Sequence, residues 1–151
     1  MREILFRGKR MDNGKWAEGY LYEHEPALVG IVSENDVPES SKWFIARTGF
    51  ADWNMPRPVE FVEIDPSTVG QYTGLKDKNG KRIFEGDIVK TDKFSEPNKQ
   101  YIIKYDLQFG AFIGQDRYNC YFVTFDGDSD EFEVIGNIHD NPKLLKGGDE
   151  E

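Results

Sequence analysis

Basic side chains gather in the middle of the sequence, and their types and spacing suit binding chemistry better than any other part of the chain. Six of them fall within 18 residues: Lys76, Lys78, Lys81, Arg82, Lys90 and Lys93. Tyr72 and Phe84 lie close to them in the sequence. On a small β-barrel, such a hairpin could contact phosphates while an aromatic ring stacks on a base. The first five cations are therefore candidate nucleic-acid contacts, although nearby carboxylates dilute them and a solvated hairpin edge is the simpler interpretation.

Residues that could carry out catalysis are few. General acid–base catalysis most often uses histidine, and the chain has two, His24 and His139. They lie in different halves, each beside Pro or Asn, so we expect surface turn residues. Cys120 lies among aromatic residues with no basic neighbour in the sequence, and we expect it to pack as a small hydrophobe. We therefore predict no catalytic residue, no cofactor and no enzymatic activity. A hydrolase or nuclease would need a pocket with a metal or converging carboxylates.

Three aspartates resemble part of a calcium loop. Asp126, Asp128 and Asp130 have the spacing of its first three ligands. The sixth position holds Glu131 where the loop needs glycine, and the twelfth holds Asn137 where it needs glutamate. The sequence therefore predicts an acidic hairpin tip and no metal site, an interpretation that calorimetric binding of calcium at micromolar levels would contradict.

Charge is distributed unevenly along the chain. The 151 residues carry a net charge of −9, divided as −4 over residues 1–65, +2 over residues 66–125 and −7 over residues 126–151. Nucleic-acid-binding domains usually show a clear basic footprint. An acidic tail beside a slightly basic middle segment argues against general nucleic-acid binding. The simpler interpretation is that the net negative charge keeps the protein soluble.

Composition also indicates which side chains build the core and in which cellular compartment the protein is expected. Aromatic residues make up 14% of the chain, and we expect these large rings to build the core, in strands more than in helices. A single cysteine excludes an intramolecular disulfide, so nothing indicates an oxidising compartment. The N-terminus lacks the apolar segment of a signal peptide, and no run approaches the ~18 apolar residues of a membrane span. We expect a soluble cytoplasmic protein.

Short alternating segments separated by turns predict an all-β chain, because no stretch keeps helical spacing for more than a turn or two. In the first part, strands are predicted over Met1–Arg7, Trp16–Tyr22, Ala27–Ser33, Trp43–Ala46 and Val59–Ile64. In the second part, they are predicted over Gln100–Tyr105, Phe109–Ile113, Asn119–Phe125 and Glu133–Ile138. A hairpin turn is expected at Asp12–Gly14. Asp65–Thr68 reads as a single helical turn between the two parts.

The most strongly patterned stretch is Val69–Lys90, which has the layout of a hairpin followed by a third apolar segment. Asn79-Gly80 is typical of a type I′ turn, which needs φ > 0 at both central residues. From Val69 onward the strands suffice for a small five-stranded barrel. We therefore predict an N-terminal antiparallel β-sheet region over residues 1–65, a barrel over residues 66–146 and a disordered tail over residues 147–151.

Turn-forming residues dominate this stretch and the end of the chain. Glycines there suit positive φ or close backbone approach, and aspartates suit the acceptance of backbone N–H bonds. These predicted structural residues are Gly70, Gly74, Asp77, Asn79, Gly80, Gly86, Asp87, Gly136 and Asn137.

Three segments together resemble the YopX family. They are Val69–Val89, with its VGQYTGLKD, NGK and IFEGDIV runs, the closing segment Ile135–Leu145 (IGNIHDNPKLL) and the opening segment Arg2–Arg7. The resemblance is weak over residues 23–60 and 92–130. It implies a protein encoded by a bacteriophage or prophage, with a β-rich N-terminal part followed by an SH3-like barrel. It implies no established activity and no catalytic residues.

Two hypotheses for function follow. The first is a non-enzymatic accessory protein in the cytoplasm of the bacterial host, acting as an interaction module for a host or phage protein. Trp53 and Phe94, which lie in predicted loops, are aromatics we expect to be exposed. The alternative is a nucleic-acid-binding regulator that uses the basic hairpin face Lys76–Lys93. An unpaired edge of the N-terminal sheet would also allow self-association.

Overall fold

The computed structural model describes residues 1–24, 41–48, 59–91, 99–123 and 131–146. Within these ranges the chain is built of antiparallel strands, with a short 3-10 helix near its end, and the prediction of an all-β fold is confirmed. Contacts divide it into an N-terminal unit, residues 5–69, and a C-terminal unit, residues 1–4 and 70–151. In the described part, no helix is long and apolar enough to cross a membrane.

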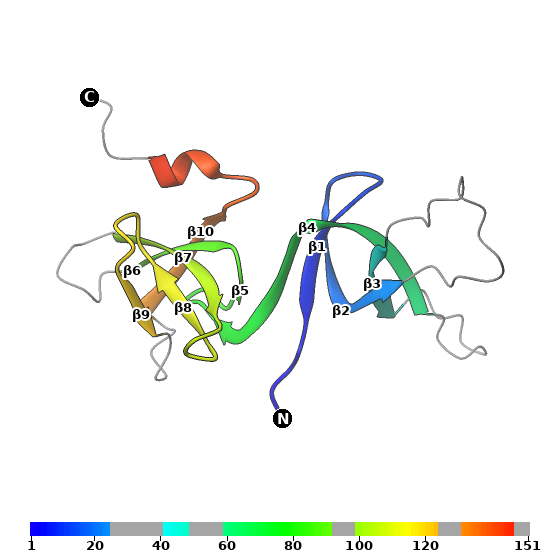
Figure 1. Ribbon diagram of the computed structural model, residues 1–151, viewed down its shortest axis with the longest axis horizontal. Coiled ribbons are helices and arrows are strands. Elements are labelled where there is room, and N and C mark those ends of the chain that lie inside the picture. The colour runs from blue at the N-terminus through cyan, green and yellow to red at the C-terminus, as the bar shows by residue number, and fades with distance from the viewer. Residues whose placement is uncertain (25–40, 49–58, 92–98, 124–130, 147–151) are drawn as a thin grey trace, which may run out of the picture. The chain divides into compact units, whose positions relative to one another are not determined.

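Four strands make the N-terminal unit (Figure 1): β1 (Phe6–Arg10), β2 (Trp16–His24), β3 (Lys42–Thr48) and β4 (Val59–Lys76), the last of which continues into the C-terminal unit. They pair in the order β1-β2-β3-β4, and β1 also pairs with β4, so the pairings close on themselves. Met11 N donates to Glu63 O at 3.0 Å, a distance typical of backbone hydrogen bonds. The unpaired edge on which we based self-association is therefore paired in these strands.

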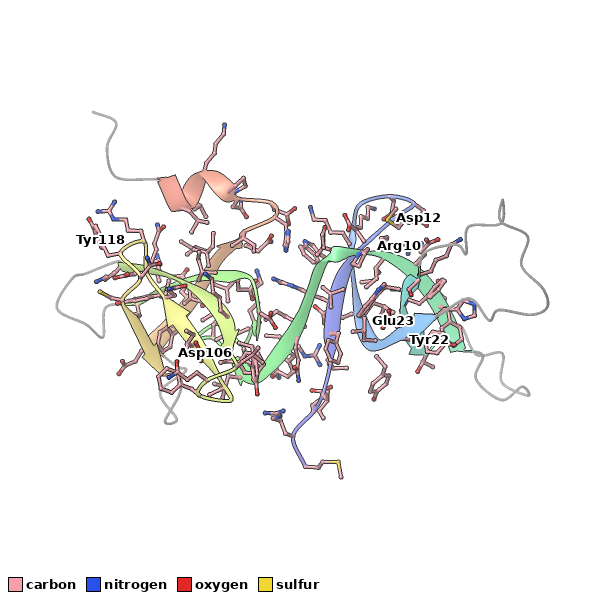
Figure 2. All side chains as sticks on the ribbon, in the orientation of Figure 1. Arg10, Asp12, Tyr22, Glu23, Asp106 and Tyr118 are labelled. Carbon is pink, nitrogen blue, oxygen red and sulfur yellow. The ribbon has the colours of Figure 1, made fainter. Side chains whose placement is uncertain are left out.

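The predicted turn at Asp12–Gly14 joins β1 to β2 as expected. Gly14 has φ +68°, and its N–H donates to Arg10 O at 2.9 Å. The Arg10 guanidinium reaches over the turn to Asp12, with Nη2 to Oδ2 at 2.7 Å (Figure 2). The glycine is needed because a side chain would disfavour this left-handed conformation. The predicted N-terminal strand Met1–Arg7 begins later than we expected, at Phe6.

The core of the N-terminal unit is aliphatic. Its buried members are Ala17, Ile45, Val62 and Ile64, and Phe6, Leu21, Trp43 and Val69 pack around them at partial burial. Val62 and Ile64 lie on the buried face of β4 while Phe61, one residue away, is exposed, as the alternation of a strand requires.

The helical turn predicted at Asp65–Thr68 is wrong, because β4 runs through it without interruption. Asp65 does act as a local acceptor, and its Oδ1 receives Ser67 N at 3.0 Å and Ser67 Oγ at 2.7 Å. However, Lys9 N on β1 donates to Thr68 Oγ1 at 2.8 Å. This bond to a neighbouring strand holds the segment extended.

The C-terminal unit contains the end of β4 and six further strands: β5 (Arg82–Phe84), β6 (Asp87–Thr91), β7 (Lys99–Asp106), β8 (Ala111–Gln115), β9 (Tyr121–Val123) and β10 (Phe132–Asn137). The 3-10 helix η2 (Pro142–Lys146) follows them. β5 pairs with β4, and the second sheet has the order β10-β6-β7-β8-β9. Its core cluster contains Ile83, Val89, Tyr101, Ile103 and Phe132.

In the part of the chain that the structure describes, the prediction that aromatic residues build the core holds only in the C-terminal unit, where Tyr72, Phe84, Tyr101, Phe112 and Phe132 are buried. Among the described residues, the largest side chains that are fully buried belong to Phe84, five isoleucines, Val89 and Asp87. Several large rings are exposed instead: Tyr20, Tyr22, Phe61, Tyr105, Phe109 and Tyr118. The core of the N-terminal unit is thus aliphatic, whereas isoleucine and valine share the C-terminal core with buried aromatic rings, and the remaining rings named here lie at the surface.

The turn between β4 and β5 is not of type I′. Gly80 has φ +79°, but among the described non-glycine residues only Asn119 has a positive φ. Gly80 N donates to Asp77 O at 2.9 Å, and Asp77 N donates to Lys81 O at 2.7 Å. This is a three-residue hairpin loop, in which a turn is followed by a single left-handed glycine.

Some sequence predictions lie outside the described residues. They concern the strand Ala27–Ser33, the residues Trp53, Lys93 and Phe94, the aspartates Asp126, Asp128 and Asp130, and the tail 147–151.

Candidate interaction surface

Exposed aromatic rings gather on one face of the sheet in the N-terminal unit. Tyr20 is 66% exposed, Phe61 56% and Tyr22 47%, and half-buried Phe44 lies beside them. The ring centroids of Tyr22 and Phe61 are 5.8 Å apart in an edge-to-face arrangement, and those of Tyr22 and Phe44 are 6.5 Å apart. We name these four residues the aromatic face. Figure 2 labels Tyr22 on its strand.

Strand register explains why these rings share one face. Tyr22 pairs with Phe44 and Tyr20 pairs with Ala46, so both tyrosines on β2 and Phe44 on β3 lie on the same side of the sheet. Ala46 in turn pairs with Phe61 on β4. The small side chain of Ala46 separates Tyr20 from Phe61 in its row, which leaves both rings open to solvent.

Carboxylates and cations lie on the same side of the sheet. Glu63 pairs with Phe44 and is exposed. Trp16, at the start of β2, carries the Arg7 guanidinium 4.5 Å from its ring centroid and the Lys9 ammonium at 5.5 Å. Such placement of a cation over a ring is stabilising.

A second exposed apolar group lies at the β7–β8 turn in the C-terminal unit. Leu107 is 89% exposed, and Tyr105 and Phe109 are also exposed. Asp106 holds the turn, because its Oδ1 accepts Gln108 N at 2.8 Å and Phe109 N at 3.0 Å. This is a smaller group than the aromatic face, and it comes from a single turn.

The structure places the predicted basic residues among acidic partners. Lys78 Nζ lies 2.9 Å and Lys90 Nζ 3.0 Å from the same carboxylate oxygen of Glu133. The hydrogen bonds from Lys78 and then from Lys90 hold the pKa of Glu133 below its usual value. Arg82 Nη2 lies 3.5 Å from Glu3 Oε1, and its guanidinium lies near the Tyr72 ring. Only part of the predicted basic face is therefore available to an anion.

Two of the predicted nucleic-acid contacts remain open. Lys76 and Lys81 are exposed, and in the described part of the chain neither makes an ion pair. Lys76 lies opposite Arg82 in the β4–β5 ladder. Of the five cations of this cluster that the structure describes, two lysines are thus open, and they lie beside an arginine engaged with Glu3.

The motif residues of the Val69–Lys90 stretch make structural contacts. Asp77 Oδ1 accepts Asn79 N and Lys81 N at 2.9 Å each, and Asp77 Oδ2 accepts Val134 N at 3.0 Å. Asp87 Oδ2 accepts Phe84 N at 2.8 Å.

The motif glycines allow close approach or unusual backbone. Gly86 has φ +87°, donates its N–H to Ile103 O at 2.8 Å and accepts Ile138 N at 2.9 Å. Gly74 has φ +90° at the point where the β4–β5 register shifts. A Cβ on Gly70 would lie 2.4 Å from Glu85 O.

The closing motif folds around Asn137. Its Oδ1 accepts His139 N at 3.0 Å and Asp140 N at 2.9 Å, and its Nδ2 donates to Asp140 Oδ2 at 2.9 Å. Gly136 makes room for Asn141, whose Oδ1 would lie 2.5 Å from an added Cβ. These contacts show that the residues of the closing motif hold the backbone of the turn in place.

The remaining candidates for chemistry do not converge. His24 is exposed at the end of β2, and half-buried His139 lies in the turn after β10. Cys120 is exposed, so the prediction that it packs as a small hydrophobe is wrong. Its N–H donates at 2.8 Å to Asp116 Oδ1 in the β8–β9 turn, which turns the residue out of the strand. Among the described residues no group of three His, Cys, Asp or Glu could hold a metal.

Glu85, in the turn before β6, carries a pKa shift with a measurable consequence. Burial raises its pKa above the usual 4.5, although a backbone hydrogen bond with Gln71 opposes this. A raised folded pKa means that stability is lost as pH rises from 4.5 through the folded value.

We therefore expect Glu85→Gln to stabilise the protein at neutral pH by up to about 1 kcal/mol. The gain should vanish below pH 4.5, where the wild-type carboxyl is protonated in both states. Urea unfolding of both proteins at the two pH values measures it, and a gain independent of pH would contradict this origin.

The chain is thus an all-β protein of two antiparallel sheets whose motif residues hold turns and close backbone contacts. The model of the YopX family, described as YopX protein, matches residues 6–146, and the chain belongs to this family.

Comparison with curated proteins and with solved structures gave the following results. No curated protein matches the chain in sequence. The chain is similar to the crystal structure of protein EF1440 from Enterococcus faecalis, at 25% identity over 96% of this chain and 99% of that one, with a TM-score of 0.49.

Proposed function

We propose that the protein is a non-enzymatic interaction module and that the aromatic face is its binding surface. The observation that carries the proposal is the exposure of Tyr20, Tyr22 and Phe61 together on one side of a sheet. Tyrosine and other aromatics are enriched at interfaces, where they anchor binding. Water-exposed rings clustered in this way are otherwise a liability for a soluble chain.

The family match supports a wider setting for this module. The resemblance to a bacteriophage or prophage family favours an accessory role in the cytoplasm of a bacterial host, with a host or phage protein as partner. The SH3-like barrel that the resemblance implies for the C-terminal unit is part of this proposal, and the five-stranded antiparallel sheet β10-β6-β7-β8-β9 is what supports it. The roles of Asp77 and Asn137 in backbone contacts favour a non-catalytic motif.

Photo-crosslinking in bacterial cells tests the proposal. Benzoylphenylalanine in place of Tyr20 should form an adduct with a partner protein, and Phe61→Ala in the same chain should abolish that adduct. Tyr118 is the matched control because it is 64% exposed, against 66% for Tyr20, and lies in the β8–β9 turn. Adducts of equal yield from positions 20 and 118, or none from position 20, would contradict the proposal.

The alternative, a nucleic-acid-binding regulator, has less support. Its predicted contacts Lys78 and Lys90 share one carboxylate of Glu133. An electrophoretic gel shift at low salt that disappears in the double variant Lys76→Glu, Lys81→Glu would favour it, because these exposed lysines make no ion pair in the described part of the chain and are open to phosphates.

A further inference from the structure

We propose that the aromatic face binds a lysine- or arginine-rich extended segment of a partner protein. This inference rests on the proposed function and adds the chemistry of the partner. Its starting point is Glu63, which completes the row Tyr22–Phe44–Glu63 across three strands. Glu63 is exposed, and in the described part of the chain its carboxylate has no cationic partner.

The rings themselves suit cations. On the same side of β2, Trp16 already holds two cations, Arg7 and Lys9, over its ring. The imidazole of His24 lies beside Tyr22, with ring centroids 6.2 Å apart, but among the residues that the structure describes no lysine or arginine lies over Tyr20 or Tyr22. These two rings therefore offer the interaction that Trp16 makes within the chain, and a cation from outside can supply the missing half.

The spacing of the rings fits an extended ligand. Tyr20 and Tyr22 are two residues apart on one strand, which places them roughly 7 Å apart along it. Alternate side chains of an extended peptide repeat at the same distance. A segment with a basic residue at every second position can thus place one cation near each tyrosine. Glu63 lies two strands across from Tyr22, so a long basic side chain directed across the sheet would be needed to pair with it.

Charge selects a basic protein segment over a nucleic acid. The whole chain has a net charge of −9, and a net negative charge favours association with a cationic partner over a phosphate backbone. Glu63, which lies beside Phe44 at the border of the aromatic face, would repel a phosphate backbone directly. Aromatic stacking alone would serve both ligands, and the carboxylate is the feature that separates them.

Fluorescence anisotropy with the full chain tests the inference. The probes are a labelled peptide of about ten residues alternating Arg and Thr, the same peptide with Glu for Arg, and an oligothymidine of similar length. The Arg peptide should bind and the other two should not. Tyr22→Ala should weaken binding about tenfold and Glu63→Gln about threefold, while Tyr22→Phe should keep most of the affinity because it keeps the ring.

Two controls separate the face from general attraction to an acidic protein. Glu131→Gln removes one exposed carboxylate from the C-terminal unit, and Tyr118→Ala removes one exposed ring there. Neither should change the affinity by more than experimental error. If Glu131→Gln weakens binding as much as Glu63→Gln, the attraction is not specific and the inference is overturned.

The remaining outcomes distinguish failure of the basic-segment inference from failure of the proposed function. Oligothymidine binding that Tyr22→Ala abolishes would overturn the basic-segment inference. If the Arg peptide does not bind but crosslinking at position 20 still captures a protein, the inference fails and the proposed function stands. If neither occurs, both fail.

Discussion

Gly70→Ala is expected to destabilise the C-terminal unit by about 3 kcal/mol, at the upper end of the usual cost of overpacking. An added Cβ would lie 2.4 Å from the carbonyl oxygen of Glu85 and 3.3 Å from its carbon. The obstacle is backbone, so no side-chain rotation can relieve the contact. β4 and the turn at Glu85 would have to move apart, although Glu85 N donates to Gln71 O at 2.9 Å beside the clash.

Gly80→Ala is the control for this substitution. Gly80 has φ +79° but nothing within 4 Å of an added Cβ, so its cost is backbone strain alone, about 1 kcal/mol. Urea unfolding followed by far-UV circular dichroism gives both values. All three tryptophans lie within residues 5–69, so their fluorescence reports on the N-terminal unit. Equal losses for the two variants would refute the steric role of Gly70.

The local features of the fold were predictable because the residues that produce them act over a few positions. Gly14 and Gly80 mark hairpin turns by their positive φ. The aspartate of a turn accepts N–H groups two to four residues away, as Asp77 does from Asn79 and Lys81. Short-range chemistry of this kind can be identified in the sequence alone.

The placement of the aromatic rings was not predictable by the same reasoning. Residues 16–22 alternate large rings with Ala17, Gly19 and Leu21, and size alone suggested that the rings are buried. In the structure the small residues face the core, because a Cβ on Gly19 would lie 2.5 Å from Ala46 O on β3. The strands approach too closely there for rings. The alternation of rings with Ala and Gly was the signal available in the sequence.

The acidic partners of the basic cluster were not predictable for a related reason. Nearness in the sequence brought Lys78 and Lys90 together with other cations, but Glu133 lies on β10, far along the chain. Likewise Arg82 meets Glu3 from the first four residues. A count of charges along a short stretch of sequence cannot show that carboxylates from distant segments pair with these cations.

Asp77→Ala is expected to cost about 3 kcal/mol, because alanine leaves three backbone N–H groups without their acceptor at about 1 kcal/mol each. Asp77 is 4% exposed, so water cannot readily replace the carboxylate. Two of the N–H groups, those of Asn79 and Lys81, belong to the β4–β5 turn. The third belongs to Val134 on β10, 57 residues away.

Asp77→Asn separates these two contributions. Its amide oxygen can occupy the place of Oδ1 and keep the turn bonds. Its NH₂ group then faces Val134 N–H, donor against donor. We expect roughly half the loss of the alanine variant. In amide hydrogen exchange, Val134 should lose protection while Lys81 keeps it.

Asp106→Ala is the matched control, since Asp106 Oδ1 accepts two backbone N–H groups, from Gln108 and Phe109, in an exposed turn. Water can satisfy those groups, so the cost should stay below about 1 kcal/mol. If Asp77→Ala costs no more than Asp106→Ala, the carboxylate does not join the hairpin to β10. If Asp77→Asn exposes Lys81 and Val134 together, the turn and β10 form one cooperative structure that depends on the bond from Val134, even though Lys78 N also donates to Phe132 O on β10.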